Sequence, residues 1–159
     1  MKTNYKLFFK ILLCTFLIGN LFVFSVVTNM DKYNSLIKPF QIPNIIFPIV
    51  WTILFILMSI SFYLITQKVD DKKYLYIYLA QLIVNSLWTL IFFGLGKYLF
   101  AFIWLIVLII LIIIMMIKYY PINKISFILL IPYLVWVIFA GYLNYMIYIK
   151  LKTSFFEYQ

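Results

Sequence analysis

Charged residues divide this chain into five long uncharged stretches. The stretches hold 20 to 29 residues each and run over 11–30, 39–67, 74–96, 98–117 and 125–149. Because an α-helix rises about 1.5 Å per residue, roughly 20 residues cross a hydrocarbon core of about 30 Å. The pattern therefore predicts an all-α integral membrane protein, built as a bundle of five transmembrane helices.

Turn-forming and polar residues place the ends of these helices. We expect helices at about 7–28, 43–66, 74–93, 98–118 and 125–150, within a single transmembrane domain that spans 1–159. Gly94 and Gly96 predict a tight turn between the third and fourth helices, and Pro121 helps to end the fourth. The longest connection, 29–42, is predicted to be a loop, and long loops in compact proteins are often lids or binding elements.

The composition agrees with a membrane protein. Hydrophobic residues make up 67% of the chain and charged residues 11%, with a mean hydropathy of +1.12, whereas a soluble domain is nearer half apolar and a quarter charged. The net charge of +9 comes from lysines that flank the spans, where they meet anionic lipid. The sequence shows neither a basic cluster nor a soluble domain, so we expect membrane lipid and no nucleic acid among its partners.

The distribution of lysines predicts the orientation of the helices. With five spans, the face that carries the N-terminus has more lysines than the opposite face. The larger group is Lys2, Lys6, Lys10, Lys68, Lys72, Lys73, Lys118 and Lys124, and the smaller is Lys32, Lys38, Lys97, Lys150 and Lys152. Under the positive-inside rule the N-terminus is cytoplasmic. Richness in Lys, Ile, Asn and Tyr indicates AT-rich coding and favours a bacterial cell membrane.

The chain lacks the residues on which most catalytic and metal sites depend. It contains no histidine and a single cysteine, Cys14, so metal centres of the His/Cys type are not expected. Its acidic residues all lie outside the predicted spans, and they are Asp31, Asp70, Asp71 and Glu157. The spans therefore hold no acid–base pair, and we predict neither catalytic residues nor a bound metal.

Three of the predicted helices carry aromatic and amide side chains along one face, at a spacing of three to four residues. Tryptophan and tyrosine are common at membrane interfaces, and amides often bond between helices. Three such stripes together favour an aromatic pocket with a few hydrogen-bonding groups, which suits a flat, largely apolar ligand. The stripes are Trp51, Phe55, Met58 and Phe62; Gln81, Asn85, Trp88 and Phe92; and Tyr133, Trp136, Ala140 and Asn144.

Three groups of residues, in order along the chain, match the pattern of a known family. The first is Tyr33-x-x-Leu36-x-Lys38-Pro39, then Pro43-Asn44, Phe47 and Val50-Trp51-Thr52-x-Leu54-Phe55. The second is Gln81-Leu82, Asn85-x-x-Trp88 and Phe92-Phe93, and the third is Pro132-Tyr133-Leu134-x-Trp136 with Phe139-Ala140-x-x-Leu143-Asn144. The chain resembles the tryptophan-rich sensory protein and translocator protein family, also known as the peripheral benzodiazepine receptor family, from about Tyr33 to Tyr148.

The resemblance implies a five-helix bundle, usually a homodimer, with a ligand cavity capped by the long first loop. Members of this family bind porphyrins such as protoporphyrin IX and haem, together with synthetic isoquinoline and benzodiazepine drugs. We expect Asn144 to tie the fifth helix to a neighbour rather than to touch the ligand. Carried onto this chain, the residues that line the cavity are Tyr33, Pro43, Phe47, Trp51, Phe55, Asn85, Trp88, Trp136, Ala140 and Leu143.

The expected function is membrane-embedded binding of porphyrins and similar flat apolar ligands, in tetrapyrrole sensing, sequestration or transport. No cofactor is obligatory, since porphyrin or haem is the ligand. Two alternatives stay open: a light-dependent enzyme that breaks down bound porphyrin, and a passive small-molecule transporter. Haem iron is usually held by His, Cys, Met or Tyr, and the chain has no histidine, so free-base porphyrin is expected to bind at least as well as haem.

Overall fold

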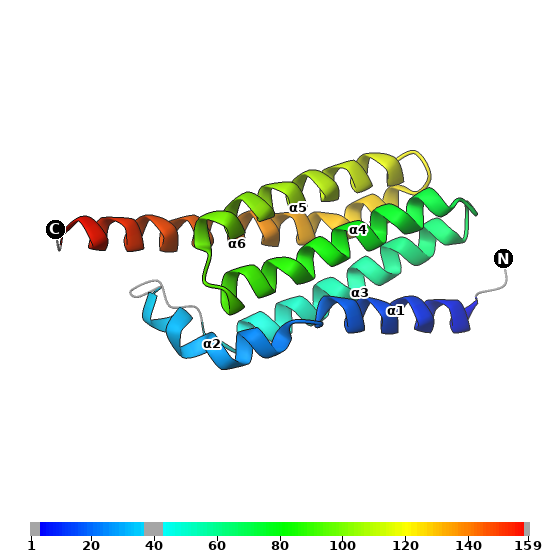
Figure 1. Cartoon of the computed structure of the whole chain (residues 1–159). Helices are drawn as coiled ribbons and strands as arrows, with labels where there is room; N and C mark the ends of the chain where they lie inside the picture. Colours follow the sequence, from blue (N-terminus) through cyan, green and yellow to red (C-terminus); the bar gives the residue numbers. More distant parts are fainter. Residues whose placement is uncertain (1–3, 37–42, 158–159) are drawn as a thin grey trace.

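The protein is a bundle of long helices that run side by side (Figure 1). The computed structural model describes residues 4–36 and 43–157, with side chains described as far as residue 153. These residues contain no strand, which confirms the predicted all-α fold. The elements are α1 Tyr5–Gly19, α2 Val23–Leu36, α3 Ile46–Thr66, α4 Lys72–Thr89, a π-helical segment η1 Leu90–Gly94, α5 Tyr98–Tyr119 and α6 Lys124–Glu157.

Four of the described helices are each long and apolar enough to cross a membrane. They are α3, α4 together with η1, α5 and α6; α1 and α2 make a fifth span if the pair, bent by 46°, counts as one. Along the bundle α5 packs on α4 and α6, while α3 packs on α1 and α6. The chain is therefore an integral membrane protein, as predicted.

The prediction of one continuous helix over 7–28 is wrong. The helix α1 ends at Gly19, and a separate helix, α2, follows it. Asn20 stands at the break and donates through its side-chain Nδ2 to the carbonyl oxygen of Phe16 at 2.9 Å. An asparagine that bonds to nearby backbone in this way competes with the helical ladder. A Cβ on Gly19 would lie 2.3 Å from Cζ of Phe55, so α1 ends where it passes closest to that ring of α3.

The predicted loop 29–42 is wrong over 29–36, which is the C-terminal half of α2. Its charged residues Asp31 and Lys32 are exposed, whereas Tyr33 is buried and Met30 is half-buried. Polar residues on one side and apolar residues on the other are typical of a helix that covers a core with one face. The remaining part of the predicted loop, 37–42, lies outside the described residues.

The other helices agree closely with the predicted ones, apart from two ends. α3 begins at Ile46 rather than at 43, because the carbonyl oxygen of Pro43 accepts the N–H of Ile46 in a turn before the helix. α6 continues to Glu157 rather than ending at 150. Its 34 residues span about 51 Å, well beyond a hydrocarbon core of about 30 Å. The C-terminal part of α6 accordingly extends past the rest of the bundle (Figure 1).

Two links between helices depend on single residues. Asp71 caps α4: its carboxylate accepts the backbone N–H of Lys73 at 2.9 Å and lies 2.7 Å from the Lys73 ammonium. The hydrogen bonds from Lys73, that of the side chain first, lower the pKa of the Asp71 carboxyl. Between η1 and α5, Gly96 takes a φ of 62°, which glycine adopts without strain. The predicted tight turn is thus confirmed.

Towards the end of the bundle that carries the N-terminus, buried polar side chains pair across helices. The hydroxyl oxygens of Thr15 on α1 and Tyr78 on α4 lie 2.6 Å apart. Tyr133 on α6 donates its hydroxyl to the amide oxygen of Gln81 on α4 at 2.8 Å. Hydrogen bonds of this kind hold transmembrane helices together. We call the region around Thr15, Tyr78, Gln81 and Tyr133 the closed half of the bundle.

Candidate functional site

A cavity of about 420 Å³ lies in the other half of the bundle, which we call the cavity half. Its walls come from the end of α1, from α2, from α3 and the turn before it, from α4 with η1, and from α6. The volume falls within the range of roughly 300–1,000 Å³ that is usual for small-molecule sites. Most of the described side chains that line it are aromatic or aliphatic, and none of them is charged. The cavity therefore suits an apolar molecule.

Aromatic rings support one another around the cavity. At one end, the ring of Tyr33 meets that of Phe47 nearly at a right angle, with centroids 5.6 Å apart, and Phe47 in turn meets Trp136 at 6.1 Å. On the wall formed by α4 and η1, Trp88 stacks on Phe92 with centroids 5.3 Å apart. Contacts of this kind are each worth about 0.5–1.5 kcal/mol beyond simple burial. The rings are thus held in place without a ligand.

The π-helical segment brings two successive phenylalanines to the cavity. Phe92 and Phe93 both line it, although successive side chains of a regular α-helix point about 100° apart at 3.6 residues per turn. The wider turn is closed by the N–H of Leu95, which donates to the carbonyl oxygen of Leu90 at 2.9 Å. Single π-helical turns inside α-helices are rare, but those that occur often lie at functional sites. Here the turn widens the aromatic wall.

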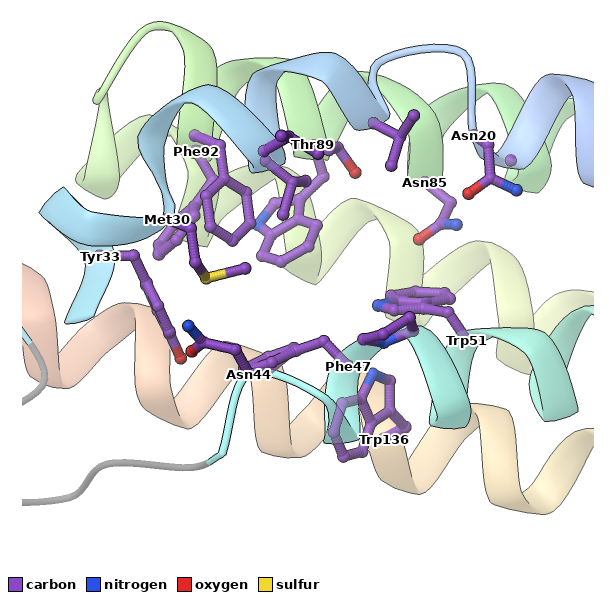
Figure 2. A pocket seen from close by; sticks show the side chains of 18 of the residues that line it. Asn20, Met30, Tyr33, Asn44, Phe47, Trp51, Asn85, Thr89, Phe92 and Trp136 are labelled. Atoms are coloured by element: carbon purple, nitrogen blue, oxygen red, sulfur yellow. The ribbon is translucent and has the colours of Figure 1, made fainter.

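Asn85 supplies a polar group at the opposite end of the cavity from Tyr33. Figure 2 shows its amide pointing into the cavity above Trp51, while Tyr33, Met30 and Asn44 stand at the far end. Asn85 is 3% exposed, and its Oδ1 atom has no hydrogen-bond partner among the described residues. A buried polar atom left unpaired costs about 1–3 kcal/mol. A bound molecule that pairs with this amide would recover that cost.

Nine of the ten residues predicted to bind a ligand surround this cavity. Pro43 does not: it is exposed in the turn before α3, and its neighbour Asn44 lines the cavity instead. The structure therefore brings together side chains from four helices that the sequence holds far apart. The nine are Tyr33, Phe47, Trp51, Phe55, Asn85, Trp88, Trp136, Ala140 and Leu143.

Asn144 ties α6 to its neighbours, as predicted. Its Oδ1 accepts the indole N–H of Trp88 on α4 at 3.3 Å, and its Nδ2 donates to the backbone carbonyl oxygen of Tyr98 on α5 at 2.7 Å. It also borders the cavity. A buried asparagine in a span needs partners for both ends of its amide, and here the cavity wall supplies one of them.

The wall that α2 contributes is the main part of the site that sequence reasoning missed. Apart from Tyr33, no predicted site residue lies on this helix. The residues that line the cavity from α2 recur at the spacing of one helical face, past the expected helix end at 28. That stripe is the signal that would have located them. It consists of Val23, Val26, Val27, Met30 and Tyr33.

The cavity opens to the outside between α2 and the beginning of α3. The lining residues of these two segments are partly at the surface: Val27 is 72% exposed, and Pro48 and Thr52 are exposed as well. Phe24 on α2 and Ile49 on α3, beside these lining positions, are also exposed. Apart from Thr52, the rim of this opening is apolar.

The fold and the cavity together define a class of protein: a small helical membrane protein with an aromatic cavity enclosed by its spans. A sequence model of the TspO/MBR family matches residues 10–149. The chain therefore belongs to the TspO/MBR family, and the resemblance seen in its motifs is confirmed.

Relatives from different organisms are similar along most of their length. The chain is 32% identical over 116 residues to a tryptophan-rich sensory protein of Cereibacter sphaeroides, covering 72% of this chain and 73% of the relative. It is 36% identical over 120 residues to the tryptophan-rich protein TspO of Archaeoglobus fulgidus, with coverages of 74% and 78%. A translocator protein homolog of Schizosaccharomyces pombe is 30% identical over 138 residues, with coverages of 82% and 81%.

Proposed function

We propose that the protein binds porphyrins and similar flat apolar ligands in its aromatic cavity, and so acts in tetrapyrrole sensing, sequestration or transport. The observation that carries this proposal is the gathering of Trp51, Trp88 and Trp136, from three different helices, around one cavity without a charged lining residue in the part of the chain that the structure describes. Flat conjugated molecules stack on such rings. Isoquinoline- and benzodiazepine-type compounds would use the same surfaces.

Recognition in this site depends on shape and stacking rather than on ligation of a metal. Among the described lining residues, the side chains able to hold a haem iron are the thioether of Met30 and the hydroxyl of Tyr33. Both lie at one end of the cavity rather than over its centre (Figure 2). We therefore expect free-base protoporphyrin IX to bind at least as tightly as haem. Asn85 would pair with a polar group at the other end of the ligand.

The test is tryptophan-fluorescence quenching of the purified protein by protoporphyrin IX, in the dark, for three proteins. In Ala140→Phe a ring fills space at the cavity wall, and in Ile138→Phe the same ring is added to a residue of α6 that is 52% exposed. We expect saturable quenching of the wild type and a loss of at least about tenfold for Ala140→Phe, which corresponds to about 1.4 kcal/mol. Ile138→Phe should bind like the wild type.

Two results would overturn the proposal. The first is quenching of the wild type that never saturates, since a defined cavity has a defined capacity. The second is equal affinity for all three proteins, which would place the porphyrin on the outside of the bundle. The aromatic rings would then serve only to pack the helices.

We also propose that the N-terminus lies in the cytoplasm, in keeping with the excess of lysines on its face. The link between α3 and α4 would then be cytoplasmic and the link between η1 and α5 external. Asp70→Cys and Lys97→Cys, each in a Cys14→Ser background, place single thiols on these links. In intact cells a membrane-impermeant maleimide should label the cysteine at position 97 and spare the one at 70. The reverse result would invert the topology.

A further inference from the structure

Asn144 joins three helices at the cavity wall. The residue is fully buried, with both ends of its amide bonded: one to the indole N–H of Trp88 at 3.3 Å, the other to the carbonyl oxygen of Tyr98 at 2.7 Å. A backbone carbonyl has two lone pairs, so the Tyr98 oxygen can accept this bond beside a helical one. The two bonds leave the amide one orientation, with its oxygen toward Trp88.

The bond to Asn144 restricts what Trp88 can offer to a ligand. An indole has a single polar atom, its N–H donor, and in Trp88 this donor points to Asn144. The ring is 7% exposed and stacks on Phe92 with an angle of 26° between the planes. Only its apolar surface is therefore available to the cavity. Rotation of the ring would break the hydrogen bond and the stack together.

The other two tryptophans of the cavity differ in this respect. Neither Trp51 nor Trp136 has an acceptor for its indole N–H among the described residues. Trp104, which does not line the cavity, donates to the carbonyl oxygen of Val84 at 2.8 Å. Trp88 is thus the one cavity tryptophan, within the described part of the chain, whose donor is occupied by the protein.

We infer that Asn144 is a positioning residue: by holding the indole N–H of Trp88, it fixes that ring as an apolar stacking surface and leaves hydrogen bonding to other groups of the cavity, such as Asn85. This inference rests on the proposed porphyrin-binding function and adds a residue that sets the geometry of the same site. A flat ligand accordingly lays an apolar face on Trp88.

Gln81 provides a control, because its amide oxygen makes a hydrogen bond between the same two helices outside the cavity. It is a fully buried amide that links α4 to α6 through Tyr133 at 2.8 Å, and it does not line the cavity. Asn144→Leu and Gln81→Leu each replace an amide with an apolar side chain and remove a bond between the same two helices. A general loosening of the bundle would affect both variants, whereas a change in Trp88 would follow from the first alone.

Asn144→Asp tests the hydrogen bond itself. A carboxyl group at a fully buried position favours its neutral form, and that form keeps both interactions: its carbonyl oxygen accepts from Trp88 and its O–H donates to the oxygen of Tyr98. We expect this variant to behave like the wild type. Rescue by a residue of the same shape would show that the bonds, and not simply the volume of Asn144, are required.

The first measurement is the affinity for protoporphyrin IX in the dark, by the quenching titration described above. We expect Asn144→Leu to lose about tenfold, or about 1.4 kcal/mol, while Gln81→Leu and Asn144→Asp stay within about twofold of the wild type. Equal losses in Asn144→Leu and Gln81→Leu would overturn the inference and assign Asn144 a structural role alone. Unchanged affinity of Asn144→Leu would overturn it as well.

The second measurement follows the indole N–H signals of the ligand-free protein by NMR, with Trp88→Phe to assign the signal of Trp88. In Asn144→Leu this signal should shift and exchange with solvent deuterium faster, while that of Trp104 stays in place. A Trp88 signal that does not respond shows that the bond is absent, which also overturns the inference. Failure of the porphyrin-binding proposal is distinguishable, since it appears as a wild type that does not bind although its Trp88 signal responds to Asn144→Leu.

Discussion

The closed half and the cavity half of the bundle share the helix α4 but use it differently. In the closed half, Tyr78 and Gln81 pair with hydroxyl groups of α1 and α6. Further along the same face, Asn85 and Trp88 line the cavity instead. One face of α4 thus changes, within a few residues, from a surface that packs against other helices into a surface that lines the cavity.

This difference between the two halves comes from the helices beside α4, namely α1 and α2, rather than from α4 itself. α1 packs closely on α3 in the closed half, whereas beyond the bend at Asn20 the helix α2 packs mainly on η1. The space between α2 and α3 is left for large aromatic rings, which hold it open because they contact one another. This cavity therefore depends on two features: the bend that takes α2 away from α3, and large aromatic side chains that support one another and do not collapse into the gap.

The largest effect is expected from damage to the closed half alone. Tyr78 is 2% exposed and stacks on Phe62 with centroids 4.3 Å apart. Tyr78→Ala removes this ring and the bond to Thr15, and should lower the free energy of unfolding by about 3 kcal/mol. Because no part of Tyr78 lines the cavity, the affinity of the folded protein for protoporphyrin IX should stay within about twofold. Denaturation in detergent and a quenching titration measure the two quantities.

Tyr78→Phe serves as the control, since it keeps the ring and removes the hydroxyl alone. Its cost should be near the value of one hydrogen bond, about 1 kcal/mol. If the affinity of Tyr78→Ala falls in step with its stability, the two halves are not independent, and the comparison between them does not hold.

A smaller effect is expected at the boundary between the halves. Gly19→Ala adds a Cβ 2.3 Å from Cζ of Phe55, so the ring must move, and the cavity is the space beside it. We expect a cost in stability of about 1 kcal/mol from this overpacking and a loss of several-fold in porphyrin affinity. Gly141→Ala is the matched change on α6, where the nearest atom is Cδ1 of Leu105 at 4.0 Å. Equal affinities for the two variants would mean that the ring of Phe55 does not shape the cavity.

The sequence predicted those features of the structure that follow directly from the type of residue at a position. Uncharged stretches long enough to cross a membrane located the spans, and the family pattern predicted ten site residues, nine of which lie around the cavity. Pro43 does not line the cavity, because the pattern identifies a turn but not which of its residues points inward. Asn44, its neighbour, takes that place.

What could not be predicted depends on packing. The segment 29–36 contains Asp31 and Lys32, and in a membrane protein such charges indicate a loop unless a partner surface for the other face is known. Likewise, nothing in the residues 90–94 distinguishes a π-helical turn from an α-helical one. Both features are decided by contacts between α2 and η1, which lie far apart in the sequence.

The smallest expected effect concerns the end of α2 beside Tyr33, which marks one end of the cavity. Lys150, on the extension of α6, donates through Nζ to the carbonyl oxygen of Leu36 at 2.9 Å, at the end of α2 and one turn beyond Tyr33. A cation at a helix C-terminus is favourable, so Lys150→Gln should loosen this end of α2 and release bound porphyrin roughly two- to fivefold faster. Stopped-flow dissociation measures this rate, with Lys152→Gln as the control on the same helix. Identical rates for the two variants would show that ligands leave by another route. The opening beside Val27 is such a route, because loosening the end of α2 would not widen it.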